Sequence, residues 1–288
     1  MKVTPMNDTL PDVTELTEEN TRREIQAGPY RVSYHEAGEG PVVIMLHGGG
    51  PGASGWANFH KNFAPFAAKY RTVLIDMLSF GRSESVVFDT EPSTTVRARA
   101  VRDLMDALGI ERASFLGNSM GGSVAMALAV DYPERVDHLV LMGASGMTRT
   151  VLFPQPTEGH RRLREASADP SVETMKALAE VMLFDPSLLT QEALEARVRT
   201  AKDPARREAA AKSTAPWRDQ TDEFAKIAAR TLIVWGREDR VNPFEIGLLL
   251  LREIPHSSMH IFRDCGHWAQ LEHPEEFNRI SMDFLDAP

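Results

Sequence analysis

The sequence predicts an α/β fold, a mostly parallel sheet flanked by helices, with a helical segment inserted between two of its strands. Short, continuously apolar runs recur along the chain, as expected of strands that are covered on both faces. Amphipathic stretches separate these runs, and strands that alternate with helices form a parallel sheet with helices on both sides. Between about residues 147 and 222 no strand-like run occurs, which indicates the helical insertion.

Composition limits the classes of function. The chain has 288 residues, of which 42% are hydrophobic and 25% charged, and these values predict one large or two small domains. A net charge of -9 argues against nucleic acid or an anionic membrane as partner. The single cysteine, Cys265, excludes an internal disulfide. Because no apolar run reaches about 20 residues and the N-terminus lacks a signal-like apolar core, we expect a cytoplasmic protein.

The first part of the chain alternates strands with helices. Residues 95–108 carry an apolar stripe typical of an amphipathic helix, and residues 123–130 form a second expected helix. The expected strands before the insertion are residues 30–35, 42–46, 72–76, 113–116 and 138–142.

The insertion is followed by two more strands. Its expected helices are residues 172–183, 190–202 and 204–213, with prolines between them. The sheet resumes at residues 231–235 and 259–262, and a last helix covers residues 274–285. We therefore divide the chain into a core, residues 1–146 and 223–288, and a helical cap, residues 147–222, which we expect to lie over the active face.

The stretch Gly117-Asn118-Ser119-Met120-Gly121-Gly122 joins an expected strand to an expected helix. A serine between two glycines at such a turn is typical of a nucleophile elbow, in which the glycines let strand and helix approach each other. The helix N-terminus behind the serine favours negative charge. The alternative is an ordinary glycine-rich turn. The elbow makes Ser119 the candidate nucleophile.

A second glycine-rich loop, His47-Gly48-Gly49-Gly50-Pro51-Gly52, follows the expected strand 42–46. A flexible loop is one explanation. Combined with an elbow, however, the loop predicts an oxyanion hole, in which bare backbone N–H groups approach a ligand oxygen. Gly48 or Gly49 would supply one N–H group and Met120 the other. The loop lacks the lysine of a phosphate loop, and no dinucleotide fingerprint occurs.

A serine needs a base to take its proton, and the base needs a third group to orient it. Asp239 and His267 each lie in a loop after an expected strand, and such loops converge at one edge of a parallel sheet. Glu238 competes with Asp239, but the shorter side chain suits a buried link to an imidazole. We expect His47 to be structural and Cys265 to be a core thiol. No residue spacing indicates a metal, and we expect no cofactor.

The whole chain resembles the α/β-hydrolases that carry a helical cap. More narrowly, it is similar to the meta-cleavage-product hydrolases, which cleave a carbon–carbon bond in 2-hydroxy-6-oxo-hexa-2,4-dienoates during bacterial aromatic degradation. Four stretches carry the resemblance: residues 16–21, the long loop 46–59, the elbow 117–122, and Gly266-His267-Trp268-Ala269-Gln270-Leu271-Glu272-His273-Pro274. The chain departs from the usual pattern at Ser79, where a glycine is common.

The resemblance implies a small-molecule dienoate substrate, no cofactor and a homo-oligomer. It assigns Gly49 and Met120 to the oxyanion hole, and it implies four substrate-binding residues: Asn58, Asn118, Arg197 and Trp268. Arg197 would bind the carboxylate end of the dienoate, since a guanidinium matches a carboxylate bidentately. Arg199 lies close by, and a solvated helix arginine is the alternative for Arg197. Candidates for lining the rest of the pocket are Val151, Met182, Leu183, Phe184 and Leu188.

Two other functions share these features. A carboxylesterase would use the same triad, but the glycine-rich loop and the cap arginine argue against it. A non-catalytic ligand-binding member of the fold would keep the fold without turnover. Dehalogenases and epoxide hydrolases of this fold place an aspartate at the elbow, so Ser119 argues against both.

Overall fold

The structure, a computed structural model, describes residues 15–147 and 155–287. Its centre is an eight-stranded sheet in the order β1-β2-β4-β3-β5-β6-β7-β8. The strands from β4 to β8 run parallel, whereas β1 and β2 form an antiparallel hairpin beside β4. The strands are β1 (Arg22–Ala27), β2 (Tyr30–Ala37), β3 (Val42–Leu46), β4 (Arg71–Ile75), β5 (Ala113–Asn118), β6 (Val136–Met142), β7 (Arg230–Gly236) and β8 (Ser257–Phe262).

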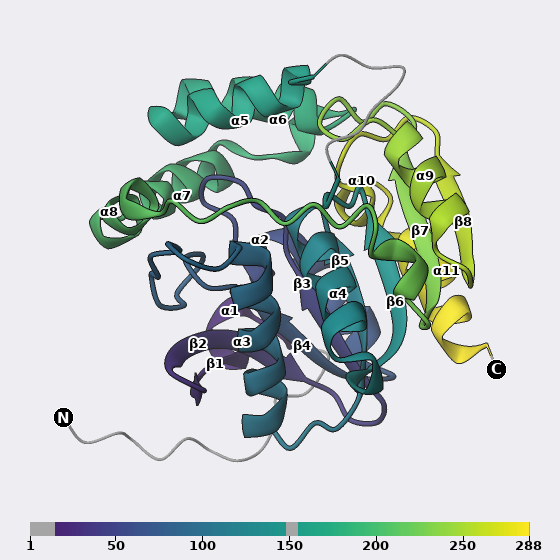
Figure 1. Ribbon diagram of the computed structural model, residues 1–288. Helices are drawn as coiled ribbons and strands as arrows, with labels where there is room; N and C mark the ends of the chain where they lie inside the picture. The colour runs from purple at the N-terminus through teal and green to yellow at the C-terminus, as the bar shows by residue number, and fades with distance from the viewer. Residues whose placement is uncertain (1–14, 148–154, 288) are drawn as a thin grey trace.

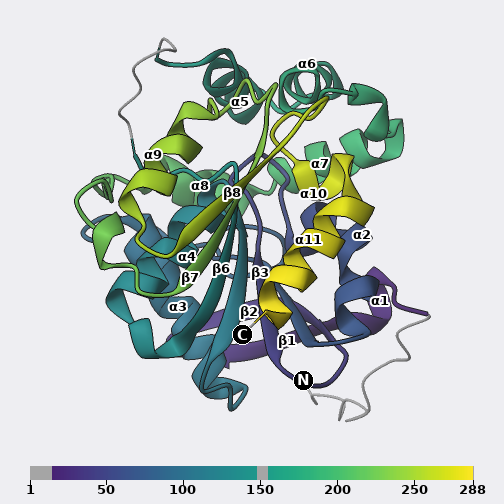
Figure 2. The same ribbon diagram turned by 90° about the vertical axis from the view of Figure 1, so that its right-hand side faces the viewer.

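Helices cover both faces of the sheet (Figures 1 and 2). On one face, α3 (Ser93–Ala107), α4 (Met120–Asp131) and α9 (Glu245–Glu253) bury apolar side chains against the strands. On the other face, α2 (Gly55–Ala67), α10 (Ala269–Glu272) and α11 (Pro274–Asp286) do the same. The four-residue helix α1 (Glu18–Thr21) precedes β1. This arrangement explains why the central strands are continuously apolar, because helices cover both faces of the sheet there.

Four helices form a separate layer above the carboxyl ends of the parallel strands (Figures 1 and 2). They are α5 (Glu158–Ala168), α6 (Val172–Met182), α7 (Gln191–Ala201) and α8 (Pro204–Lys212). The apolar faces of α5, α6 and α7 share a cluster of their own, which includes Met175, Leu178 and Leu194 and reaches Trp268 below. The layer corresponds to the expected cap, and the division at residues 147 and 222 stays a prediction.

Six of these helices and strands were not predicted from the sequence: α1, β1, α2, α5, α9 and α10. The strand β1 is largely polar, and it joins the sheet by pairing along its whole length with β2. The helix α5 is rich in arginine and glutamate and buries only Gly159 and Ala166 fully. No helix among the described residues is both long and apolar enough to cross a membrane.

Candidate active site

The elbow around Ser119 has the tight geometry that its glycines suggest. Ser119 lies between the end of β5 and the start of α4 with φ of 52°, a left-handed backbone that non-glycine residues rarely adopt. A Cβ atom on Gly117 would lie 2.6 Å from the carbonyl oxygen of Gly121, and one on Gly121 would collide with the Leu46 carbonyl. The strain is therefore maintained by close packing of β3, β5 and α4.

His267 and Asp239 form a buried pair. Nδ1 of His267 lies 2.7 Å from Oδ2 of Asp239, and both side chains are almost fully buried. The other carboxylate oxygen of Asp239 accepts hydrogen bonds from the N–H groups of Val241 (2.8 Å) and Asn242 (2.9 Å). Because this carboxylate accepts the Nδ1 proton, the Nε2 lone pair of the imidazole is available to act as a base.

Glu238 faces elsewhere. Its Oε2 accepts the N–H group of Cys265 at 3.1 Å, and its Oε1 pairs with Arg237. The structure therefore gives the two adjacent acids different partners, and only Asp239 reaches the histidine. The thiol of Cys265 is buried, and burial raises its pKa, as expected of a core thiol.

Ser119 and His267 line the same small pocket, although they lie far apart in the sequence. Its glycine-rich wall lies beside the elbow, because a Cβ atom on Gly49 would be 2.9 Å from Sδ of Met120. A Cβ atom on Gly48 would be 3.4 Å from Cβ of Ser119. The pocket is lined by Gly48, Gly49, Gly50, Ala53, Asn58, Ser119, Leu163, Met182, Arg197, His267 and Trp268.

Two buried amides support the pocket. Asn118 donates from Nδ2 to the carbonyl oxygens of Met142 (3.2 Å) and His267 (3.4 Å), so it links the elbow to the histidine loop. Asn58 donates to Oδ1 of Asn118 over 3.5 Å. Among the described residues Oδ1 of Asn58 has no hydrogen-bond partner. A buried acceptor without a partner is costly, so a ligand donor would be favoured there.

Arg197 is a buried cation at the same pocket. Its side chain is only 7% exposed, and its guanidinium carbon lies 4.7 Å from the ring centre of Trp268. No described residue offers it a carboxylate or a hydrogen bond, and burial lowers its pKa to about 10, which still leaves it charged at neutral pH. The alternative of a solvated helix arginine is therefore wrong for Arg197, whereas Arg199 is exposed.

The cap also contacts the catalytic loops through the backbone. The N–H group of His267 donates to the carbonyl oxygen of Met182 at 2.7 Å. A Cβ atom on Gly266 would lie 2.5 Å from that same oxygen, so the residue before the histidine has to be small. On the other side, Oγ1 of Thr157 donates to the carbonyl oxygen of Val241, 2.8 Å away. The position of the imidazole therefore depends on α6.

His47 is part of the structural framework of the glycine-rich loop. It is fully buried, its Nε2 accepts the N–H group of Met77 at 3.1 Å, and its Nδ1 lies 2.8 Å from the carbonyl oxygen of Gly48. Burial lowers its pKa to about 4, so the ring is neutral. The expectation of a structural role agrees with these contacts.

Comparisons with known proteins place the chain in a family. Residues 41–274 match the family model described as the alpha/beta hydrolase fold. A 2-hydroxy-6-oxo-6-phenylhexa-2,4-dienoate hydrolase of Comamonas testosteroni is 44% identical, with 95% of this chain and 99% of the relative covered. A solved meta-cleavage product hydrolase from Pseudomonas fluorescens IP01 matches with a TM-score of 0.82 and 33% identity, over 92% of this chain and 97% of that one.

The chain belongs to the meta-cleavage-product hydrolases of the α/β-hydrolase fold. This confirms the fold and the family predicted from the sequence. A second relative from Comamonas testosteroni, 41% identical over 95% of this chain and 99% of its own length, is a 2-hydroxy-6-oxononadienedioate/2-hydroxy-6-oxononatrienedioate hydrolase. These two relatives from Comamonas testosteroni are therefore named for different dienoate substrates.

Sequence reasoning was less accurate for the pocket walls of this meta-cleavage-product hydrolase. Met182 lines the catalytic pocket, whereas Phe184 is 52% exposed and is not part of the pocket lining. Val151 lies outside the described residues. Leu163 was missed, because α5 has few apolar residues and was not predicted as a helix. The described residues include no group of three or more histidine, cysteine or acidic side chains that could hold a metal ion.

Proposed function

We propose that the protein hydrolyses the carbon–carbon bond beside the remote carbonyl of a 2-hydroxy-6-oxo-hexa-2,4-dienoate, with Ser119, His267 and Asp239 as its catalytic triad. The observation that carries the proposal is the buried 2.7 Å contact between His267 and Asp239 at a pocket that Ser119 also lines. The reaction class is inferred from the family, and the three residues proposed to carry it out are inferred from their positions at the pocket.

The proposed reaction begins when the dienol ketonises, which creates an electron sink next to the bond that breaks. Nε2 of His267 then takes a proton from Ser119, or from a water molecule, and the resulting nucleophile attacks the remote carbonyl carbon. The N–H groups of Gly49 and Met120 would hold the oxyanion, and losing one such donor typically costs about 3–4 kcal/mol of barrier.

Collapse of the oxyanion breaks the carbon–carbon bond. Its electron pair moves into the ketonised fragment, which gains a proton and leaves as 2-hydroxypenta-2,4-dienoate or a substituted relative. Water supplies the hydroxyl group of the carboxylic acid product. No cofactor is needed for this balance, because no net oxidation or reduction occurs.

Substrate binding is proposed for four side chains. The guanidinium of Arg197, which is buried and has no ion-pair or hydrogen-bond partner among the described residues, suits the dienoate carboxylate, and the ring of Trp268 would hold that guanidinium in place. The unsatisfied Oδ1 of Asn58 would accept the 2-hydroxyl proton, while Asn118 would keep Asn58 oriented. A neutral ester would leave the buried charge of Arg197 without a partner, which disfavours a simple carboxylesterase.

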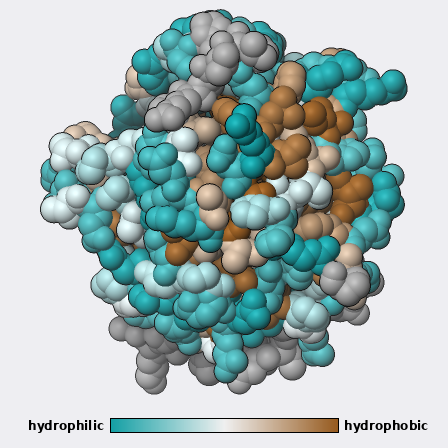
Figure 3. All heavy atoms as spheres, turned by 45° about the vertical axis from the view of Figure 1, so that its right-hand side comes forward, coloured by the Kyte–Doolittle hydropathy of each residue, from teal (hydrophilic) through white to brown (hydrophobic). Residues whose placement is uncertain are grey.

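We also propose a cytoplasmic homo-oligomer, a dimer or larger. Three apolar residues are exposed on α9 and on β8, the strand at the edge of the sheet: Leu248 (45%), Leu251 (36%) and Ile261 (41%). Figure 3 shows hydrophobic side chains gathered on the side of the molecule that carries these elements. Exposed apolar patches and open sheet edges favour association, and sedimentation equilibrium would measure the assembly.

The test is to mix the protein with a yellow dienoate and follow the loss of its visible absorbance, with Ser119→Ala alongside. We expect rapid bleaching by the wild type and a loss of at least ~10³-fold in kcat for the variant. Thermal unfolding of the variant is the control for folding. Hydrolysis of p-nitrophenyl esters without any dienoate cleavage would leave a carboxylesterase, and no turnover of either would leave a ligand-binding protein.

A further inference from the structure

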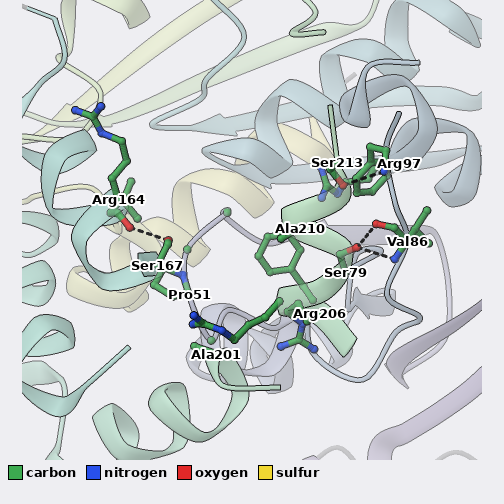
Figure 4. A pocket seen from close by; sticks show the side chains of 17 residues that line it. Pro51, Ser79, Val86, Arg97, Arg164, Ser167, Ala201, Arg206, Ala210 and Ser213 are labelled. Carbon is green, nitrogen blue, oxygen red and sulfur yellow. Dashed lines mark hydrogen bonds between the residues drawn. The ribbon is translucent and has the colours of Figure 1, made fainter. Parts of the chain in front are cut away.

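A cavity of about 520 Å³ lies beside the catalytic pocket (Figure 4). Its walls come from the glycine-rich loop, the loop after β4, and the cap helices α5 and α8. It shares Gly49, Gly50 and Leu163 with the pocket that contains Ser119. Two other lining residues, Arg164 and Arg207, are exposed at the surface. The cavity therefore extends from the surface to the wall of the catalytic pocket.

The described lining of this cavity carries positive charge alone. It includes four arginines, Arg97, Arg164, Arg206 and Arg207, and no aspartate or glutamate. Figure 4 shows Arg97 and Arg206 at the cavity, while the side chain of Arg164 extends away from its centre. Because the whole chain has a net charge of -9, this local excess of arginine is opposite in sign to the molecule as a whole.

Arg97 is the most deeply buried of the four lining arginines. It is only 7% exposed, and its guanidinium carbon lies 4.5 Å from the ring centre of Phe88 and 5.4 Å from that of Phe80. Its Nε donates to the carbonyl oxygen of Leu78 at 3.2 Å. Within the described residues its two terminal nitrogens have no hydrogen-bond partner, so a buried cation is left with donors to offer.

The other three arginines form no ion pair with an acidic side chain among the described residues, although Asp76 and Asp203 lie near enough to Arg206 to influence its pKa. Arg206 donates to the carbonyl oxygens of Thr200 (2.8 Å) and Gly81 (2.7 Å), and its Nε is buried without a partner among the described residues. Neither Arg164 nor Arg207 forms an ion pair in the part of the chain that the structure describes. A series of arginines without carboxylates is typical of a surface that attracts anions.

We propose that this cavity is the entrance through which the anionic dienoate reaches the catalytic pocket, and that its arginines hold the substrate carboxylate before it passes to Arg197. The identity of the ligand, a linear enolic carboxylate, rests on the proposed function. The reason for such a device is electrostatic. A protein of net charge -9 repels anions at long range, and a locally positive channel restores attraction where it is needed.

The test uses the two exposed arginines, because their replacement does not disturb the buried cluster around Arg97. In Arg164→Gln/Arg207→Gln we expect kcat/KM for a dienoate to fall about five- to ten-fold at low salt, through KM rather than kcat. At about 0.3 M salt the difference should shrink, since the Debye length becomes shorter than the cavity. Turnover of neutral p-nitrophenyl butyrate should be unchanged.

The matched control is Arg252→Gln/Arg263→Gln. These arginines are 83% and 84% exposed and lie on the α9 and β8 side of the molecule, so the variant removes the same charge far from the cavity. Equal losses of kcat/KM in both double variants would show that the effect comes from the net charge alone, and would overturn the proposal that the cavity is the entrance. Unchanged dienoate kinetics in Arg164→Gln/Arg207→Gln would also overturn it. A wild type that cleaves no dienoate would overturn the proposed function first.

Discussion

The two adjacent acids after β7 differ in what they hold in place. Asp239 accepts hydrogen bonds from the His267 ring and from two backbone N–H groups. Glu238 accepts a hydrogen bond from the backbone N–H group of Cys265 and forms an ion pair with Arg237. The carboxylate of Asp239 thus fixes the tautomer of His267, the proposed base, and that of Glu238 anchors the loop that contains Cys265. The two side chains make a matched pair for mutation.

We predict that Asp239→Asn lowers kcat/KM by about 10²–10⁴-fold, because an amide no longer selects the Nδ1–H tautomer or stabilises the imidazolium. Glu238→Gln should change it less than about three-fold, since the amide oxygen can still accept the Cys265 N–H group. Steady-state kinetics with a dienoate measures both. Equal losses in the two variants would show that the acids are not divided in this way.

Local motifs led to the proposed triad residues, whereas the sequence carries no comparable signal for which polar side chains are buried. Ser119 lies between the glycines of the elbow, and His267 follows a glycine in a loop after an expected strand. Nothing in Glu195-Ala196-Arg197, by contrast, distinguishes a buried arginine from a solvated one. The burial of Arg97 likewise results from packing between α3 and the loop after β4, which brings together residues far apart in the chain.

At the scale of elements, the elbow depends on contact between backbones. A Cβ atom at Gly121 would meet the backbone of Leu46 at the end of β3, so α4 could not keep its position. Gly109, unlike Gly121, has a positive φ, 65°, but a Cβ atom there would meet nothing within 4 Å. The two glycines separate the cost of crowding from the cost of backbone conformation.

We predict that Gly109→Ala lowers the free energy of unfolding by about 1–2 kcal/mol, the cost of a left-handed alanine. Gly121→Ala should cost about 3 kcal/mol or more, because the added methyl group has to separate α4 from β3. Urea unfolding at neutral pH measures both. Similar small losses would mean that the elbow relaxes easily and that its strain is not maintained by packing.

Elements with a clear apolar period were predictable, and those held by their neighbours were not. The helices α3 and α11 and all the parallel strands were found within a few residues of their bounds. The helix α5 has little apolar surface and is stabilised by packing on α6, while β1 depends on β2. Likewise the strand order, with β4 between β2 and β3, follows from three-dimensional packing rather than from any local pattern.

For the whole molecule, two buried neutral histidines create a sensitivity to acid. Burial lowers the pKa of His35 and of His47 to about 4, below the usual 6.5. The unfolded chain therefore binds more protons than the folded one between these values, and stability is full above pH 6.5 and falls as the pH drops towards 4. Burial raises the pKa of Asp76 and of Glu272, which opposes this trend.

We predict that His35→Gln reduces the acid sensitivity. A pKa shift of this size contributes at most about 3 kcal/mol to the free energy of unfolding. The difference in the free energy of unfolding between wild type and variant should therefore shrink by up to about 3 kcal/mol from pH 7.5 to pH 4.5. Urea midpoints at the two pH values measure it. A gap that stays constant would indicate that His35 is not held neutral in the folded protein.

The contact between Met182 and the His267 backbone has a consequence for protein engineering. Substrate range in this fold could be altered by grafting a cap from one homologue onto the core of another. Here the graft would also exchange the carbonyl that fixes the catalytic loop and the surface against which Gly266 fits. A chimera would therefore inherit a displaced base unless the loop of residues 265–268 is transplanted together with α6.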